Sequence, residues 1–334
     1  MNAIHLCCGA GGITLGFEQA GIESRFAFDI SPMAVATHQT NFPLGTCEVH
    51  DIRDLHGRDL PLADVWTCGI PCEPFSVAGR RLEHQDDRDI STELARLLHE
   101  SEGADRGARF VFLENVPLYR NSLGAQCIKE ALRGWAIWES VVAHADYGIC
   151  QKRQRWHLIA YRDGNVLVPQ PTHAEQADMF GRSAWVRFGE IRERPVDDPH
   201  YMSARALRGI IRRQRSKTLS GLALDRGVFS TIYVVDDEDM MPTVLSSWYH
   251  GISGNQAAVV FDDFRFRMPT WSETMRAQGF PETFEFCGTM RERYEQLGRA
   301  VPPPFARAVG EALLDTNGAP REMIRDSVLA MPCL

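Results

Sequence analysis

The chain contains 334 residues, with 36 Lys and Arg against 44 Asp and Glu, a net charge of −8 and 44% hydrophobic residues. This length accommodates one large domain or two modest ones, and the apolar fraction supplies a substantial core, which excludes wholesale disorder. The negative charge excludes a generally basic surface. It does not exclude a local surface for nucleic acid, because the field depends on how the charges are distributed.

Targeting and redox signals predict a reduced, cytoplasmic protein. No apolar run reaches the roughly 18 residues needed to span a membrane, and no basic segment precedes a long apolar run at the start, so we expect neither a membrane contact nor a signal peptide. The nine cysteines are scattered and form no Cys-x-x-Cys pair. We therefore expect neither a disulfide framework nor a zinc knuckle, and predict no metal.

Short apolar runs alternate with helical stretches over the first 160 residues. The predicted strands are 4–6, 24–29, 65–68, 110–113 and 156–161. Strands that alternate with helices predict an α/β fold, a doubly wound and mostly parallel sheet covered on both faces.

The later part of the chain loses this rhythm. A Pro-containing segment at 168–171 opens it, and the apolar spacing beyond is irregular until a helix predicted at 304–315. We predict a first domain at 1–165, a smaller irregular domain at 166–290, and a segment at 291–334 that returns to the first domain; the resemblance given below implies that the first is catalytic and cofactor-binding and the second a target-recognition domain.

A basic stretch at 201–220 contains no Asp or Glu. Its cations are Arg205, Arg208, Arg212, Arg213, Arg215 and Lys217. This asymmetry in an acidic protein fits either a solvated helix face or a surface for nucleic-acid phosphates, and we favour the second.

A glycine-rich turn, Leu-Cys-Cys-Gly-Ala-Gly-Gly at 6–12, follows the first predicted strand. Asp29 ends the next apolar run, 20 residues after Gly9, where an acid is placed to hold ribose hydroxyls. The Gly-x-Gly-x-x-Gly spacing of dinucleotide sites is not met. The pattern therefore predicts an adenosine-containing ligand without favouring a pyrophosphate.

Three further groups of polar residues follow apolar runs. Cys72 lies in a Gly- and Pro-containing loop after 65–68, and Glu114 ends the strand predicted at 110–113. Arg153 and Arg155, two apart at the start of a strand, face the same side and suit an anion or a phosphodiester. A lone cysteine is more often a buried small residue than a nucleophile, but this acid and these cations favour a catalytic interpretation.

In this order, the four groups resemble the DNA cytosine-5 methyltransferases, together with segments at 268–281 and 296–301. The resemblance covers nearly the whole chain except about 175–260. It implies the S-adenosylmethionine-dependent methyltransferase fold, a monomer, and double-stranded DNA as partner. It also implies a role in a bacterial or phage-infected cell, such as restriction-modification.

The resemblance also implies roles for individual residues. The catalytic set is Cys72, Glu114, Arg153 and Arg155. The cofactor-binding set is Gly9, Ala10, Gly11, Gly12, Asp29, Asp51, Ile52, Pro71, Asn115, Arg299 and Val301. The expected DNA-binding set is Arg80, Arg81, Arg88, Gln151, Arg208, Arg212, Arg213, Arg215 and Lys217. Its first three members lie in a segment at 77–92 that resembles a loop closing over DNA.

The implied reaction transfers a one-carbon-derived group to C5 of a flipped-out cytosine through a bond between Cys72 and C6. Two alternatives remain: a catalytically inactive DNA-binding relative, and an RNA cytosine-5 methyltransferase. The Cys-Phe-Thr signature expected of the RNA enzyme is absent. Intact Cys72 and Glu114 argue against an inactive relative.

The chain departs from the family pattern in three motifs. Cys7 replaces a Phe of the cofactor loop, Ile70 and Glu73 replace the Pro and Gln of Pro-Pro-Cys-Gln, and Arg299 replaces an Asn near the transferable carbon. A fixed cation beside a sulfonium is repulsive. Either a carboxylate such as Glu73 pairs with Arg299, or the cofactor carries the anion. The second case predicts carboxy-S-adenosylmethionine as cofactor and 5-carboxymethylcytosine as product.

Overall fold

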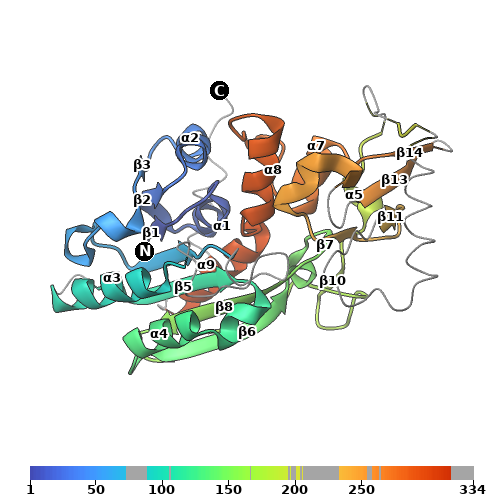
Figure 1. Cartoon of the computed structure of the whole chain (residues 1–334). Helices are drawn as coiled ribbons and strands as arrows, with labels where there is room; N and C mark the ends of the chain where they lie inside the picture. The colour runs from blue at the N-terminus through green and yellow to red at the C-terminus, as the bar shows by residue number, and fades with distance from the viewer. Residues whose placement is uncertain are drawn as a thin grey trace, which may run out of the picture.

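The computed structural model describes residues 1–72, 89–104, 107–165, 167–194, 196, 201–203, 205, 233–253, 258–262 and 265–316. A seven-stranded sheet runs through it in the order β3-β2-β1-β4-β5-β8-β6 (Figure 1). In that order the strands are Thr46–Val49, Glu23–Asp29, Asn2–Leu6, Val65–Gly69, Phe110–Asn115, Gln154–Tyr161 and Ala136–Ala143.

The sheet is mostly parallel. Strands β3, β2, β1, β4 and β5 run in one direction, and β8 is antiparallel to both β5 and β6. The five strands predicted from sequence are all present, and the predicted α/β class is confirmed. Strands β3 and β6 were not predicted, because both are short of buried positions and lie at the two edges of the sheet.

Helices cover both faces. Helices α3 (Ser91–Gly103) and α4 (Leu123–Ala131) pack on one face, and α1 (Gly12–Ala20) and α9 (Pro303–Thr316) on the other. Successive residues of a strand point to opposite faces. In β5, Val111 and Leu113 therefore join the α3 and α4 core, whereas Phe110 and Phe112 join the α1 and α9 core. The helix predicted at 304–315 is α9, and it packs against α1.

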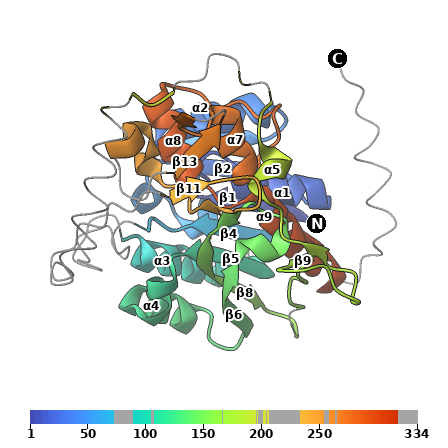
Figure 2. The same ribbon diagram turned by 90° about the vertical axis from the view of Figure 1, so that its right-hand side faces the viewer.

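A third core lies beside the sheet, where β11, β13, β14, α5 and α7 gather (Figures 1 and 2). Phe188, Trp248 and Phe280 are buried in it, and Leu297 of α8 joins them. This region is the irregular segment expected after residue 165. The predicted boundaries at 165/166 and 290/291 stay a proposal.

The remaining elements are short. The helices are α2 (Pro32–Asn41), α5 (Phe188–Ile191), α7 (Trp271–Ala277), α8 (Met290–Arg299), η1 (Ile52–Asp54), η2 (Gly57–Asp59), η4 (Pro117–Asn121), η5 (His144–Tyr147) and η7 (Ser246–Ser253). The strands are β7 (Gln151–Lys152), β9 (His173–Ala174), β10 (Ser183–Ala184), β11 (Tyr233–Val235), β12 (Met241–Pro242), β13 (Ala258–Asp262) and β14 (Arg265–Arg267). Within the described ranges, no helix combines the length and apolar character needed to cross a membrane.

A buried ion pair joins β14 to α7. Arg267 is 1% exposed and Glu273 is fully buried, and two nitrogens of the guanidinium lie 2.8 and 2.7 Å from the two carboxylate oxygens. Asp262 accepts a third bond from Arg267 at 2.8 Å. The same Glu273 carboxylate accepts the backbone N–H of Thr270 and so caps the start of α7.

We expect Glu273→Ala to lower the free energy of unfolding by about 3–5 kcal/mol, because it leaves a buried guanidinium with one carboxylate fewer. Urea unfolding of the purified protein measures this loss. Glu311→Ala is the matched control, since it breaks an exposed pair with Arg307 one helical turn away and should change stability by less than about 0.5 kcal/mol. Equal losses in the two variants would contradict the expectation.

Candidate active site

A cavity of about 360 Å³ opens at the carboxyl ends of β1, β2, β4 and β5. Ligand sites of parallel α/β sheets lie at this edge. The cavity brings together all four residues of the predicted catalytic set. It also brings together nine residues of the predicted cofactor set: Gly9, Ala10, Gly12, Asp29, Asp51, Ile52, Pro71, Arg299 and Val301.

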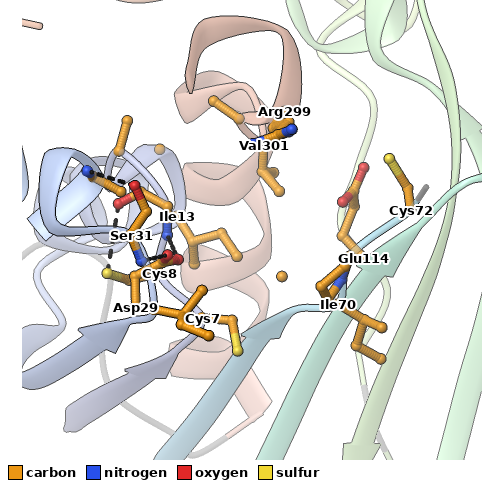
Figure 3. A pocket seen from close by; sticks show the side chains of 18 of the residues that line it. Cys7, Cys8, Ile13, Asp29, Ser31, Ile70, Cys72, Glu114, Arg299 and Val301 are labelled. Carbon is orange, nitrogen blue, oxygen red and sulfur yellow. Dashed lines mark hydrogen bonds between the residues drawn. The ribbon is translucent and has the colours of Figure 1, made fainter. Parts of the chain in front are cut away.

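The glycine-rich turn is held by Asp29. The backbone N–H of Gly9 donates to one carboxylate oxygen at 2.9 Å, and that of Ser31 donates to the other at 2.9 Å. Gly9 has a φ of +55°, which favours glycine. The predicted acid and the predicted turn therefore form one unit, with Asp29 facing the cavity (Figure 3).

The start of α1 touches the segment that follows α8. A Cβ on Gly12 would lie 2.1 Å from the carbonyl oxygen of Val301, so only glycine fits there. This close approach explains why residues near both ends of the described chain line the same cavity.

Asp51 and Ile52 lie on another part of the wall. Asp51 caps η1 through the backbone N–H of Arg53 at 3.0 Å, and it pairs with the Arg53 guanidinium at 3.0 Å. Its oxygens thus have a fixed orientation at the cavity edge, and a contact with a base stays a prediction.

Cys72, Glu114 and Arg155 line the cavity across from Asp29. Figure 3 shows Cys72 and Glu114 close together on that side. Glu114 is 6% exposed, and its Oε1 lies 3.2 Å from Nε of Arg155. Burial raises the pKa of Glu114, and the charges of Arg155 and Arg153 oppose that rise.

Arg153 is buried and bonded to the backbone. Its two terminal nitrogens donate to the carbonyls of Gly298 at 3.1 Å and Ala300 at 3.3 Å, on either side of Arg299. Burial lowers the pKa of Arg153 to about 9, so the side chain stays charged at neutral pH. The geometry favours a positioning role for Arg153, and the predicted nucleotide anchor stays a prediction for Arg155.

Three predicted residues do not line the cavity. Asn115 donates to the Ile70 carbonyl at 3.5 Å and thereby supports the loop that carries Cys72. Gly11 packs against the Phe42 ring. Gln151 is fully buried, and its amide bonds to the backbone of Val244 and Ala277. Gln151 thus joins segments of the fold in this conformation, and its DNA contact stays a prediction.

The other predicted DNA contacts lie outside the described residues. They are Arg80, Arg81, Arg88, Arg208, Arg212, Arg213, Arg215 and Lys217. The same holds for Glu73 and for most of the predicted loop at 77–92.

Sequence reasoning missed several lining residues, among them Ser31, Ile70, Ile90 and Gln296. Ile70 directly precedes the predicted Pro71, so its position carried a signal. Cys7, which replaces the aromatic residue of the family pattern, adopts a φ of +50°. A hydrogen bond with Cys68, together with burial, raises the pKa of the Cys7 thiol well above its usual value, so this side chain presents a neutral group to the cavity.

Known proteins are similar to this chain over most of its length. The family model described as C-5 cytosine-specific DNA methylase matches residues 1–315. The chain is 29% identical over 320 residues to the Type II methyltransferase M.NlaX of Neisseria lactamica, covering 93% of this chain and 95% of the relative. It is 29% identical over 332 residues to M.NgoMIV of Neisseria gonorrhoeae, covering 94% and 97%.

Solved structures show the same fold. The Dnmt2 methyltransferase of S. pombe matches with a TM-score of 0.73 at 18% identity, covering 95% of this chain and 99% of its own. The Entamoeba histolytica methyltransferase EhMeth matches with a TM-score of 0.72 at 18% identity, covering 95% and 98%.

Proposed function

Since the chain belongs to the C-5 cytosine-specific DNA methylase family, we propose that Cys72 bonds covalently to C6 of a cytosine flipped out of double-stranded DNA. Membership places the chain among the DNA cytosine-5 methyltransferases, a family that uses S-adenosylmethionine. The observation that carries the covalent step is the shared cavity, which holds Cys72, Glu114 and Arg155 together with the cofactor residues.

The step begins at the sulfur of Cys72. Cytosine C5 is a poor nucleophile, and addition of a thiolate to C6 pushes the ring electrons toward C5. Cysteine suits this role because sulfur is both nucleophilic and a good leaving group. After transfer, a base removes the C5 proton, the C6–S bond breaks, and Cys72 leaves as the thiolate.

Glu114 acts at N3 of the same ring. Its burial and its raised pKa support a protonated carboxyl that hydrogen-bonds N3 and stabilises the charge that develops as the C6–S bond forms. Arg155, 3.2 Å from Glu114, orients that carboxyl and presents its remaining donors to the target nucleotide.

The other wall of the cavity fits the cofactor. Asp29, fixed by two backbone N–H groups, would accept the ribose hydroxyls, and Asp51 with Ile52 would hold the adenine. When bound, S-adenosylmethionine supplies an electrophilic carbon to C5. A Cβ on Gly9 would meet no protein atom within 4 Å, so this glycine leaves open space beside the turn for the ligand.

The alternatives differ in measurable ways. An inactive DNA-binding relative would form no bond to cytosine, although Cys72 and Glu114 are intact and face one cavity. An RNA cytosine-5 methyltransferase would modify RNA in preference to DNA. The covalent trap described next distinguishes the proposed enzyme from an inactive relative. Parallel assays on DNA and RNA distinguish it from an RNA methyltransferase.

We expect Cys72→Ser to reduce turnover to below a few per cent and to leave DNA affinity unchanged, because a hydroxyl is far less ionised than a thiol. Duplex DNA with 5-fluorocytosine in place of cytosine should trap the native enzyme as an adduct on Cys72, detected by mass spectrometry. Cys127→Ser, a cysteine on α4 outside the cavity, is the control and should form the adduct. Turnover by Cys72→Ser, or an adduct on another residue, would refute the assignment.

We expect Glu114→Gln to slow transfer by about 10²-fold or more, the usual effect of losing a positioned acid. The pH profile gives the sign. The protonated form of Glu114 is lost as the pH rises through its raised pKa, so the turnover of the native enzyme should fall over that range. The Gln variant should lack this descending limb. The control Glu311→Gln, on the exposed side of α9, should match the native profile. A normal rate for Glu114→Gln would show that Glu114 does not act at N3.

We further propose that Arg299 selects the transferred group. Arg299 lines the cavity, and Figure 3 shows it between the Asp29 side and the Cys72 side. Its charge acts on Asp29, where it opposes the rise in pKa caused by burial. The sulfonium of S-adenosylmethionine is a cation, which a fixed guanidinium repels.

Carboxy-S-adenosylmethionine carries a carboxylate on the transferred carbon, and an Arg fork binds a carboxylate through two parallel bonds. In this reaction C5 of cytosine bonds to the carboxymethyl carbon, the carbon–sulfur bond breaks, and S-adenosylhomocysteine leaves. Loss of the C5 proton then gives 5-carboxymethylcytosine. The Arg153 side chain donates to the backbone carbonyls of the residues before and after Arg299, and these hydrogen bonds hold Arg299 in place.

The test is competition between the two cofactors, with nucleoside mass spectrometry of the product DNA. We expect the native enzyme to prefer carboxy-S-adenosylmethionine and Arg299→Asn to lose that preference, because the neutral amide no longer pairs with the carboxylate. Methylation without a carboxymethyl product by the native enzyme would show instead that Asp29 or another carboxylate neutralises Arg299.

A further inference from the structure

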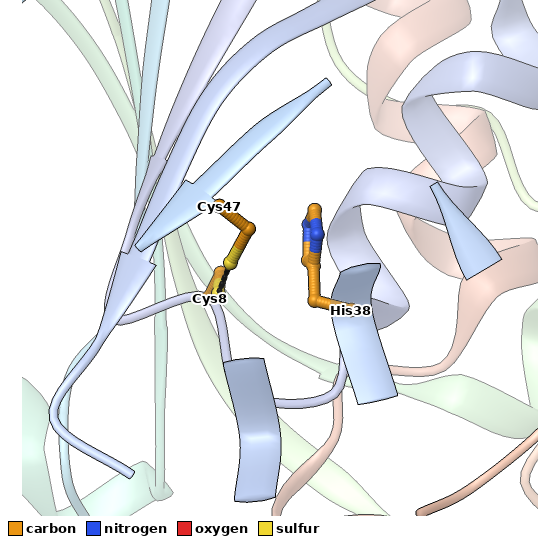
Figure 4. Close-up of side chains that lie close together, drawn as sticks. All are labelled: Cys8, His38 and Cys47. Carbon is orange, nitrogen blue, oxygen red and sulfur yellow. Dashed lines mark hydrogen bonds between the residues drawn. The ribbon is translucent and has the colours of Figure 1, made fainter. Parts of the chain in front are cut away.

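A cluster of metal-ligating side chains lies beside the glycine-rich turn, apart from the proposed reaction. It consists of Cys8 in that turn, His38 on α2 and Cys47 on β3 (Figure 4). One donor atom from each of the three residues lies within 4.8 Å of the other two. His38 and Cys47 are 1% and 3% exposed, so the cluster faces the interior of the fold.

The distance between the two sulfurs matches that between two sulfur ligands of one metal ion. Sγ of Cys8 and Sγ of Cys47 are 3.8 Å apart. Two thiolates bound tetrahedrally at about 2.3 Å from a zinc ion lie about 3.8 Å from one another. A disulfide requires sulfurs at about 2.05 Å, so the observed spacing fits a shared ion better than a bond.

His38 has one nitrogen satisfied and one available. Its Nε2 hydrogen-bonds Oγ1 of Thr14 at 3.0 Å, whereas its buried Nδ1 has no hydrogen-bond partner among the described residues. A buried polar atom without a partner is costly and calls for an explanation. A proton held on Nε2 by Thr14 leaves the lone pair of Nδ1 free, the arrangement common to metal-bound histidines.

From these contacts we propose that Cys8, His38 and Cys47 bind one Zn²⁺ ion. Two cysteines and one histidine form a donor set that Zn²⁺ prefers, with a fourth tetrahedral position open to water. The sequence predicted no metal because the ligands come from three separate segments, 30 and 9 residues apart, with no short Cys-x-x-Cys spacing. The fold brings them together where β3 pairs with β2 and α2 packs on β3.

This ion would join β3 and α2 to the turn that holds the cofactor. Cys8 directly precedes Gly9, whose N–H donates to Asp29. The ion is thus structural in the proposal. It takes no part in transfer to cytosine, and its presence does not depend on which group is transferred.

The experiment measures metal on the full-length protein, purified under reducing conditions without chelator. We expect about one zinc per chain by elemental analysis. After zinc removal, titration with Co²⁺ should produce thiolate-to-cobalt charge-transfer absorption together with the visible bands of tetrahedral Co²⁺. Cys47→Ser should lower the Co²⁺ affinity by about 10²-fold or more, whereas Cys127→Ser, the matched control on α4, should leave it unchanged.

Thr14→Val offers a milder variant that keeps all three ligands. It removes the hydrogen bond on Nε2 of His38 and should weaken Co²⁺ binding by about 10–100-fold, the usual effect of losing such an outer partner. Circular dichroism of each metal-free variant confirms that it is folded.

Two results would overturn the proposal. One is a folded native protein that carries no zinc and gives no cobalt absorption. The other is a Cys8–Cys47 disulfide, found by peptide mass mapping, in protein kept under reducing conditions. Neither result bears on the Cys72 adduct, so the two ideas are tested separately.

Discussion

The buried guanidinium of Arg153 is the interaction on which the site depends. It lies just before β8, among the groups that line the cavity, and its two terminal nitrogens bind backbone carbonyls at the end of α8 and just beyond it. A buried cation needs partners for its donors. Those carbonyls provide partners for its two terminal nitrogens, and the strand that presents Arg155 is thereby fixed to the segment that presents Arg299. The two sides of the cavity share one anchor.

Strand direction supplies the second constraint. Strand β8 runs antiparallel to β5, so the beginning of β8 lies at the edge where β5 ends. Glu114 at the end of β5 consequently meets Arg155 at the start of β8. In an all-parallel sheet these two side chains would lie at opposite edges. Because β8 runs antiparallel to β5, the acid and the cation lie together at the ends of neighbouring strands. No long loop is needed to bring one side chain to the other.

Much of this could be predicted from the sequence. The five predicted strands are those with continuous apolar runs, and their carboxyl ends placed the turn at Gly9, Asp29, Cys72 and Glu114 at one edge. The edge strands β3 and β6 escaped, since an edge strand with exposed positions has no such run.

The order of motifs predicted which residues serve the chemistry, but not what each one touches. Arg153 and Asn115 fell in matching motifs, yet their bonds go to backbone carbonyls. Such partners are set by tertiary packing and leave no pattern in the local sequence. The same is true of His38 and Cys47, which meet only after α2 and β3 have folded against the turn. Local sequence patterns predict features that form within one helix or strand. They do not predict a cluster whose residues come from three separate elements.

The contact between Gly12 and the Val301 carbonyl has a consequence for synthesis on the ribosome. The backbone that closes the cavity beside the glycine-rich turn is made about 290 residues after the turn itself. At translation rates of about 5–20 residues per second, that interval lasts roughly 15 to 60 s. During that interval the nascent chain has the glycine-rich turn but not the wall that completes the cavity. The cavity is therefore complete only after the backbone around Val301 has been made, whatever the concentration of ligand around the chain.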